Sequence, residues 1–378
     1  MDYTCPIHLE VLQDHPGSCP LCRRKKTKSF KILSFILFVG LLIVACFFYD
    51  EYLLSSPKTI ESCIQKMLPK EESLIYVKRM QGGFVNTIWQ VYTSKGRYIL
   101  REKASKVTAS AFLKDIEMAK RASEYGIGPA VIGINVRRQQ ILLQYIEHVN
   151  WPKFEENAEP YKKAMLALKI FHEKMPSSRR FDKSATYAPF SYIFYKGKQI
   201  QDQLPEEFSL ALQKLESILD ELTPWLKDHA VLCHGDFCKA NVLLSKNLTP
   251  LLIDFDSASI GDPLLDVAKF SLFLPKEKRL ELFQTYLGTS SLSQEELKHF
   301  ELMDLSLLML VSTCRFDSAR NAPLEEKLSK TEMEEILHSK APLPSFLKVS
   351  FKDTSPKAKQ LGALFALDEF LKRSEALR

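Results

Sequence analysis

The sequence of 378 residues lacks repeated long apolar runs, a dense cysteine pattern, internal repeats and low-complexity tracts. Only one stretch is both long and free of charge, which excludes a membrane protein with many spans. The composition, 46% apolar and 26% charged, excludes a disordered or collagen-like chain. At roughly 150 residues per domain, the length suggests about two and a half domains.

A strong excess of one charge is also missing. The chain has 52 Lys and Arg residues against 46 Asp and Glu residues, a net charge of +6. Residues 1–31 contain six basic and three acidic side chains and so supply half of that charge. The main body therefore lacks the basic field typical of nucleic-acid binding, and we expect no nucleic-acid partner.

The eight cysteines are too sparse for a disulfide-stapled secreted domain. Most of them are scattered along the chain, and we expect these to remain thiols in a reducing compartment. They are Cys46, Cys63, Cys233, Cys238 and Cys314.

The N-terminal 26 residues contain a Cys-x2-His pair followed by a Cys-x2-Cys pair, which together offer a complete tetrahedral set for Zn²⁺. His15 is an alternative fourth ligand, and a reduced tail without metal is the alternative structure. The segment resembles the small heavy-metal-binding domain of metal-efflux proteins, although Ile7, Leu9 and Arg23-Arg24 depart from its pattern. The predicted zinc ligands are Cys5, His8, Cys19 and Cys22.

Residues 32–49 contain no charge. Eighteen helical residues reach about 27 Å, close to the roughly 30 Å of a bilayer core. We therefore predict a transmembrane helix over residues 30–50, contact with membrane lipid and a single-pass membrane location. A buried core helix is one alternative, and a lipoprotein cleavage box at Ile43-Val44-Ala45-Cys46 is another.

The remaining chain changes from a β-rich to a helical pattern. We predict an α+β fold with two lobes and a cleft between them, a β-rich lobe at 58–147 and a helical lobe at 148–378. A helix with Phe112, Ile116 and Ala119 on one stripe follows the third strand. The predicted strands cover residues 74–77, 88–92, 98–100, 130–134 and 140–145. The later helices are predicted over 161–175, 208–226, 264–287, 294–314 and 358–373.

Two short motifs in the helical lobe carry chemistry. The first is His234-Gly235-Asp236-Phe237-Cys238-Lys239-Ala240-Asn241, and the second is Ile253-Asp254-Phe255-Asp256. Each acidic group adjoins a short apolar strand, where a carboxylate is costly unless it meets a cation or a hydrogen bond. This order and spacing is typical of phosphoryl transfer, in which one carboxylate accepts a proton while an amide oxygen and a second carboxylate bind Mg²⁺.

These motifs resemble those of the choline/ethanolamine kinase and aminoglycoside phosphotransferase group, over about residues 74–275. The resemblance implies a two-lobed protein kinase-like fold and the cofactors ATP and Mg²⁺. It also implies that Asp236 is the general base and that Asn241 and Asp254 bind Mg²⁺. His234 and Asp266 would support the catalytic loop. Asp256, two residues beyond the metal-binding Asp, would be a candidate contact for the acceptor.

A glycine pair, Gly82-Gly83, lies between the first two predicted strands. Glycines there let backbone N–H groups approach a phosphate, although a simple hairpin turn is the alternative. With Asn86 and Arg101 the pair is similar to the choline kinase pattern of Gly-Gly-x-x-Asn and a strand ending in Arg. By that resemblance, Arg101 would contact the nucleotide phosphates.

The acid that pairs with Arg101 should lie on the following helix. Glu117 is our first choice and Asp115 the second, whereas a solvated helix face is the alternative for both. The resemblance also implies that the backbone around Glu147 faces adenine.

The sequence therefore predicts a membrane-anchored kinase that transfers the γ-phosphate of ATP to a hydroxyl of a choline-like or other small alcohol. An aminoglycoside or sugar phosphotransferase and a catalytically degenerate binding or scaffold protein are the alternatives. The basic cluster Arg23–Lys28 before the predicted span, with Asp50-Glu51 after it, predicts that the main domain lies outside, where ATP is scarce. The side on which the catalytic domain lies is therefore left open.

Overall fold

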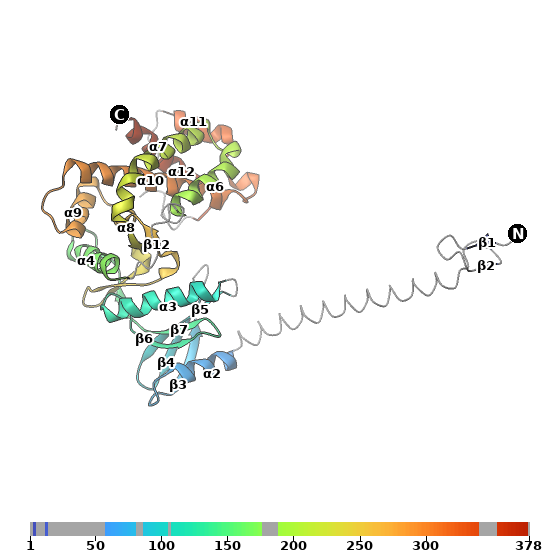
Figure 1. The fold of residues 1–378 in the computed structure, drawn as a ribbon, viewed down its shortest axis with the longest axis vertical. Helices are drawn as coiled ribbons and strands as arrows, with labels where there is room; N and C mark the ends of the chain where they lie inside the picture. Colours follow the sequence, from blue (N-terminus) through green and yellow to red (C-terminus); the bar gives the residue numbers. More distant parts are fainter. Residues whose placement is uncertain are drawn as a thin grey trace. The chain divides into compact units, whose positions relative to one another are not determined.

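The computed structural model describes residues 3–4, 12–13, 57–80, 86–104, 107–175, 188–339 and 354–376. The chain divides into two compact units, residues 1–78 with 91–96, and residues 79–90 with 97–378. Strands dominate the early part of the main body and helices the later part, so the α+β class is confirmed (Figure 1).

The first unit contains helix α2 (Pro57–Met67) and most of strand β3 (Leu74–Arg79). Ile60 and Ile64, four residues apart on α2, are fully buried, as expected for an amphipathic helix. The Gln65 side chain joins the helix to the strand, since its oxygen accepts from the Leu74 N–H at 2.9 Å. Two short strands, β1 (Tyr3–Thr4) and β2 (Leu12–Gln13), also pair antiparallel in this unit.

The main sheet has the strand order β3-β4-β5-β7-β6, and the division between the units passes through β4 (Asn86–Thr93). In the second unit, β5 (Arg97–Lys103) and β7 (Gln140–Gln144) are antiparallel, with Arg101 opposite Ile141. Strand β6 (Val131–Asn135) completes this edge. Leu100 and Arg101 are both buried, so β5 lies inside the fold on both faces.

Helix α3 (Ala109–Glu124) begins at Thr108, whose hydroxyl accepts from the Ala111 N–H. Its buried residues follow a helical period and include the stripe predicted from the sequence. Asp115 is the one acidic residue among them, with Phe112 three residues before it and Ile116 directly after it. The helix therefore presents a carboxylate within its apolar face.

Two small antiparallel sheets, one of three strands and one of two, hold the predicted catalytic motifs. Strand β10 (Val242–Ser245) pairs with β11 (Pro250–Leu252) and with β8 (His148–Val149). Strand β9 (Val231–Cys233) pairs with β12 (Ser259–Gly261). Short 3-10 turns η2 (Lys239–Asn241) and η3 (Phe255–Ser257) lie between these strands. Each motif therefore begins or ends at a paired strand.

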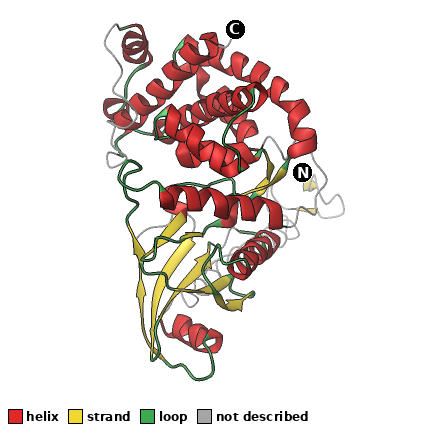
Figure 2. Cartoon of the chain, turned by 90° about the vertical axis from the view of Figure 1, so that its left-hand side faces the viewer, coloured by secondary structure: helices red, strands yellow, loops and turns green. Residues whose placement is uncertain are grey.

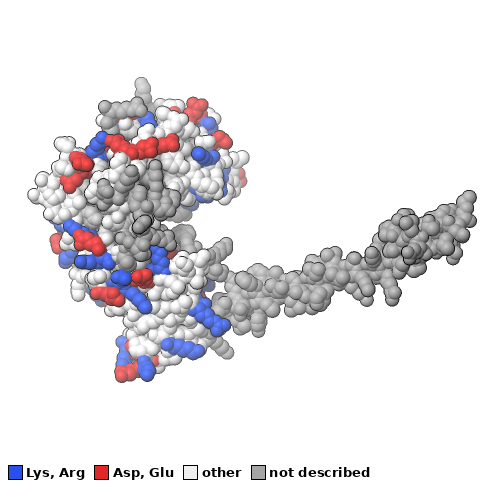
Figure 3. Space-filling view, viewed as in Figure 1, with Lys and Arg blue, Asp and Glu red and all other residues white. Residues whose placement is uncertain are grey.

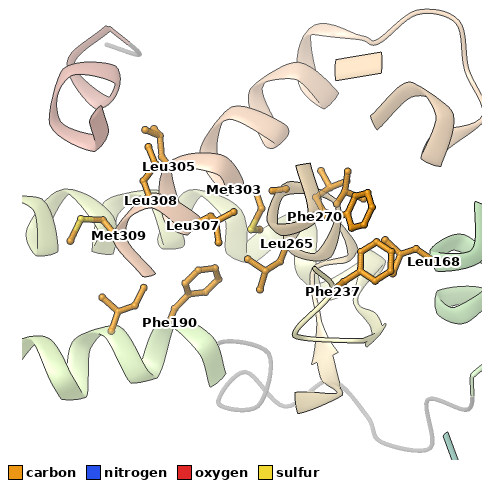
Figure 4. Close-up of a cluster of buried hydrophobic side chains, with 14 of the residues drawn as sticks. Leu168, Phe190, Phe237, Leu265, Phe270, Met303, Leu305, Leu307, Leu308 and Met309 are labelled. Carbon is orange, nitrogen blue, oxygen red and sulfur yellow. The ribbon is translucent and has the colours of Figure 1, made fainter. Parts of the chain in front are cut away.

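Helices build the rest of the second unit (Figure 2). Helix α10, the longest of the described helices at 26 residues, packs against α6, α7, α8 and α12. Its buried residues Met303, Leu307 and Met309 join a large apolar cluster with Phe190 and Leu265 (Figure 4). The helices are α4 (Glu159–Lys174), α6 (Ala188–Ile200), α7 (Glu206–His229), α8 (Pro263–Ser271), α9 (Lys276–Leu287), α10 (Gln294–Ala319), α11 (Lys330–His338) and α12 (Pro356–Ala376).

One predicted helix is wrong as a single element. Residues 264–287 form two helices, α8 and α9, because the chain leaves α8 at Leu272 and Pro275 stands at the start of α9. A proline disfavours helical backbone at the residue before it, here Leu274.

The predicted single-pass membrane location is corrected. Among the described residues, no helix combines the length and the apolar character that a bilayer span needs. Helix α10 is long enough, but it carries Glu295, Glu296 and Lys298 in its first turns, and its apolar side chains pack inside the protein. Residues 30–50, on which the prediction was based, lie outside the described residues.

Candidate active site

The β10–β11 hairpin brings the two predicted metal ligands to the same end. Val242 pairs with Leu252, and the Ile253 N–H donates to the Asn241 carbonyl at 3.0 Å. Asn241 therefore precedes β10 where Asp254 follows β11. Two residues that are distant in the sequence become neighbours because the hairpin register places them so.

Asp236 is oriented from both sides of its carboxylate. The Asn241 side-chain nitrogen donates to Asp236 Oδ2 at 2.7 Å and to the Asp236 carbonyl at 2.9 Å. Lys269 Nζ lies 2.6 Å from Oδ1. The Asp236 side chain is 42% exposed, so it can meet a substrate. Both bonds described for the Asn241 side chain use its amide nitrogen, so among the described residues its amide oxygen stays available to a cation.

Asp266 holds the backbone of the catalytic loop. Its carboxylate is fully buried and accepts from the N–H groups of His234 at 2.6 Å and Gly235 at 2.9 Å. His172 Nε2 lies 3.1 Å from the same carboxylate. Burial acts to raise the pKa of Asp266, but the hydrogen bond and charge of His172 and the charge of His234 leave it lowered overall. Asp266 is therefore ionised in the folded chain.

His234 is buried and has a fixed tautomer. Its Nε2 lies 3.0 Å from the Ile253 carbonyl, which can only accept, so Nε2 carries the proton. Burial lowers the pKa of His234, which favours the neutral ring. This bond joins the first motif to the strand that leads into Asp254.

Gly235 is required by the geometry of this turn. Its φ is +77°, in the left-handed region that favours glycine. A Cβ at this position would collide with the Ser257 carbonyl. The glycine thus allows the catalytic loop to approach the loop after Asp254.

Asp254 has the features of a cation ligand. It is not a glycine, yet its φ is +66°, a conformation that is uncommon and strained. Its Oδ1 is buried and has no hydrogen-bond partner in the described part of the chain. Arg101 Nη1 lies 3.6 Å from that oxygen, beyond hydrogen-bond distance. A buried carboxylate oxygen without a donor fits a Mg²⁺ ligand, together with the amide oxygen of Asn241.

Arg101 pairs with Asp115 and not with Glu117, which corrects our first choice. Both side chains of the Arg101–Asp115 pair are almost fully buried, and Asp115 lies on the apolar stripe of α3. Glu117, two residues further on, points to another face of the helix, where it pairs with Arg121 and is 53% exposed.

Sequence reasoning missed Lys103, a second buried cation beside Arg101. It lies two residues after Arg101 on β5, and strand alternation places both side chains on one face. Lys103 contacts Asp256 and lies 3.4 Å from Asp115. Burial and then the charge of Arg101 lower the pKa of Lys103, against the opposing effect of Asp115. The alternation Arg-x-Lys was the signal that could have identified it.

Asp256, the predicted acceptor contact, also accepts from the Asn86 side chain at 3.3 Å. The site therefore joins side chains from β4, β5, α3 and η3 within the second unit. The Glu147 side chain lies at the surface, 2.9 Å from Lys246 and 3.9 Å from Arg97, and the adenine contact expected of the backbone around it stays a prediction. The hydrogen bond from Lys246 is the main cause that lowers the pKa of Glu147.

The remaining predicted site residues lie outside the described residues, and their roles stay predictions. This applies to the glycine pair and to all four zinc ligands: Gly82, Gly83, Cys5, His8, Cys19 and Cys22.

Comparison with known families agrees with this geometry. The family profile described as phosphotransferase enzyme family (APH) matches residues 77–299, more than half of the chain. The chain therefore belongs to the phosphotransferase enzyme family, and the resemblance of its two catalytic motifs is confirmed, whereas the resemblance of the N-terminal segment stays a prediction. No curated protein matches the chain in sequence.

Solved structures similar to this chain include two choline kinases. The choline kinase of Cryptosporidium parvum is 15% identical with a TM-score of 0.59, and the match covers 85% of this chain and 96% of that one. Choline kinase LicA of Streptococcus pneumoniae is 16% identical with a TM-score of 0.54, over 84% and 98%. A putative aminoglycoside phosphotransferase of Ralstonia eutropha is 11% identical with a TM-score of 0.53, over 84% and 98%. At these identities the likeness shows the kinase-like fold.

Proposed function

We propose that this chain is a small-molecule kinase that transfers the γ-phosphoryl group of ATP to a hydroxyl of a choline-like or other small alcohol. One observation carries the proposal. The carboxylate of Asp236 lies within 2.7 Å of the Asn241 amide, and Asn241 adjoins the end of β11, where Asp254 has a buried oxygen without a hydrogen-bond partner among the described residues.

Each residue would have a separate role in the transfer. Asp236 would accept the proton of the acceptor hydroxyl. At the same time the hydroxyl oxygen would bond to the γ-phosphorus, and the bond between that phosphorus and the leaving oxygen of ADP would break. Asn241 and Asp254 would hold Mg²⁺, which supplies positive charge to the nucleotide phosphates. Arg101, held by Asp115, would contact phosphate oxygens.

The identity of the acceptor rests on the similar folds and on the acids near the site. Two choline kinases are among the solved structures similar to this chain, which supports a small alcohol as the acceptor. The acceptor role of Asp256 remains a prediction, and its described partners are Lys103 and Asn86. A second acid of the helical part, Asp317 on α10, accepts a hydrogen bond from the Tyr192 hydroxyl at 3.1 Å.

The test is ADP release by the full chain with ATP and Mg²⁺, screened across choline, ethanolamine, thiamine, simple sugars and an aminoglycoside. Asp236→Ala should lower kcat by about 10²–10⁴-fold, the usual contribution of a general base. Asp254→Ala should abolish turnover because a metal ligand is lost. Asp202→Ala, at an exposed aspartate in η1, is the matched control.

Turnover that persists at the wild-type rate in both Asp236→Ala and Asp254→Ala would contradict the proposal. Nucleotide binding without turnover, for every acceptor, would instead favour the alternative of a catalytically degenerate binding protein.

A further inference from the structure

Lys269 contacts the predicted general base, although no motif drew attention to it. It lies in the last turn of α8, and its Nζ is 2.6 Å from Asp236 Oδ1 and 3.0 Å from the Gly235 carbonyl. Its side chain is 25% exposed. The ammonium therefore bonds at once to the reactive side chain and to the backbone of the loop that carries it.

The helix that supplies Lys269 is fixed to the catalytic loop on the same face. Lys269 and Phe270 lie three and four residues after Asp266, so each is a neighbour of Asp266 on the surface of α8. Asp266 accepts from the loop N–H groups, and the Phe270 ring lies 4.9 Å from that of Phe237. Figure 4 shows Phe270 and Phe237 close together. Lys269 thus comes from a rigid support, unlike a surface lysine that forms a weak and mobile ion pair.

The two donors to Asp236 divide its oxygens between them. Lys269 meets Oδ1 and the Asn241 amide meets Oδ2, so the plane of the carboxylate is defined. Only the Lys269 contact brings a full positive charge. That charge offsets the carboxylate at the moment when negatively charged phosphates must approach it.

We propose that Lys269 is a positioning residue for phosphoryl transfer, which orients Asp236 and offsets its negative charge. The inference rests on the proposed kinase function and adds a residue to it. If Lys269 acts on the transfer step and not on nucleotide binding, its loss should lower kcat while the KM for ATP changes little.

The experiment compares Lys269→Met, Lys269→Arg and Lys162→Met in the full chain. Methionine keeps the length of the side chain without its charge, and arginine restores the charge. Lys162 lies on α4 and pairs with Glu281 at 2.9 Å, so its substitution is the matched control. The measurements are kcat and KM for ATP, with the acceptor that supports wild-type turnover, and the unfolding midpoint in urea.

We expect Lys269→Met to lower kcat by about 10²-fold, as for loss of one preorganised charged donor, with the KM for ATP changed by less than about threefold. Lys269→Arg should recover at least about tenfold of that loss, and Lys162→Met should match the wild type. An unchanged kcat in Lys269→Met would overturn the inference and leave the proposed function intact.

A loss of kcat that arginine does not recover, together with a lower unfolding midpoint, indicates a structural role and also overturns the inference. Absence of turnover in the wild-type chain overturns the proposed function and this inference with it.

Discussion

At the residue scale, Asp115 interacts with two buried cations, Arg101 and Lys103, and not with Arg101 alone. Its buried carboxylate meets Arg101 and lies 3.4 Å from Lys103, whose side chain is also buried. The positive charges of Arg101 and Lys103 are balanced by Asp115 from α3 and by the two acids of the 254–256 loop. Removing one partner of a buried ion pair leaves uncompensated charge, which is more damaging than removing the whole pair.

Asp115→Asn should therefore destabilise the fold by about 3–5 kcal/mol and weaken nucleotide binding. Glu117→Gln, the matched control on the exposed face of the same helix, should change stability by less than about 0.5 kcal/mol. Urea unfolding and binding of a fluorescent ATP analogue measure the two effects. Equal destabilisation by the two substitutions would contradict this role of Asp115.

At the element scale, helix α8 connects the core to the catalytic loop. It begins at Asp262, whose side chain accepts from the Leu264 N–H at 2.8 Å and lies 2.6 Å from His299 Nε2. The same helix carries Asp266 and Lys269. Its N-cap therefore affects both stability and the geometry of the site.

Asp262→Ala should cost about 2–4 kcal/mol, because both the helix cap and the buried partner of His299 are lost. It should also lower kcat. Ser329→Ala removes the N-cap of α11, where the serine bonds to Glu332. That control should cost about 1 kcal/mol and leave kcat unchanged. Denaturation curves measure the change in stability, and initial rates measure kcat under conditions in which both variants are folded. An equal loss of kcat in Asp262→Ala and Ser329→Ala would contradict the effect of the α8 cap on the site.

The sequence predicted the elements that follow a simple period. Alternation identified the strands of the main sheet, and helical spacing identified α3, α4 and α7. It missed α6, α11 and the break between α8 and α9, where apolar residues continue across Leu274-Pro275. Apolar periodicity continues through that boundary and does not show the helix end that the proline imposes on the residue before it.

The candidate site was predictable where the motif itself supplies the residues, as for Asp236, Asn241 and Asp254. Lys269 was not predictable, because it reaches Asp236 from a helix that packing brings to the loop. The choice between Asp115 and Glu117 was decidable in principle. Asp115 lies on the apolar stripe, and a buried cation requires its acid on that face.

At the scale of the whole molecule, charge is dispersed. Basic and acidic side chains are interspersed over the face shown in Figure 3. The net charge of +6 is small for 378 residues. Global charge repulsion is therefore a weak influence on stability near neutral pH, and individual buried groups should dominate its pH dependence.

His234 and Asp266 are such groups. Burial lowers the pKa of His234 below its ordinary value of 6.5, so the unfolded chain takes up this proton first as the pH falls. The free energy of unfolding therefore decreases as the pH falls from about 6.5 towards the pKa of His234 in the folded chain, by up to about 1.4 kcal/mol per pH unit. For Asp266, burial raises the pKa, but His172 and His234 outweigh it and leave the pKa below 3.8. A further loss follows below that pH.

We expect urea unfolding of the full chain to show lower stability at pH 5.5 than at pH 7.5. His234→Gln should reduce this difference, because glutamine can still donate to the Ile253 carbonyl but does not titrate. His148→Gln, at an exposed histidine, is the matched control and should retain the wild-type difference. If His234→Gln keeps the full pH dependence, or if the wild type becomes more stable on acidification, protonation of the catalytic loop does not govern the acid stability of this fold.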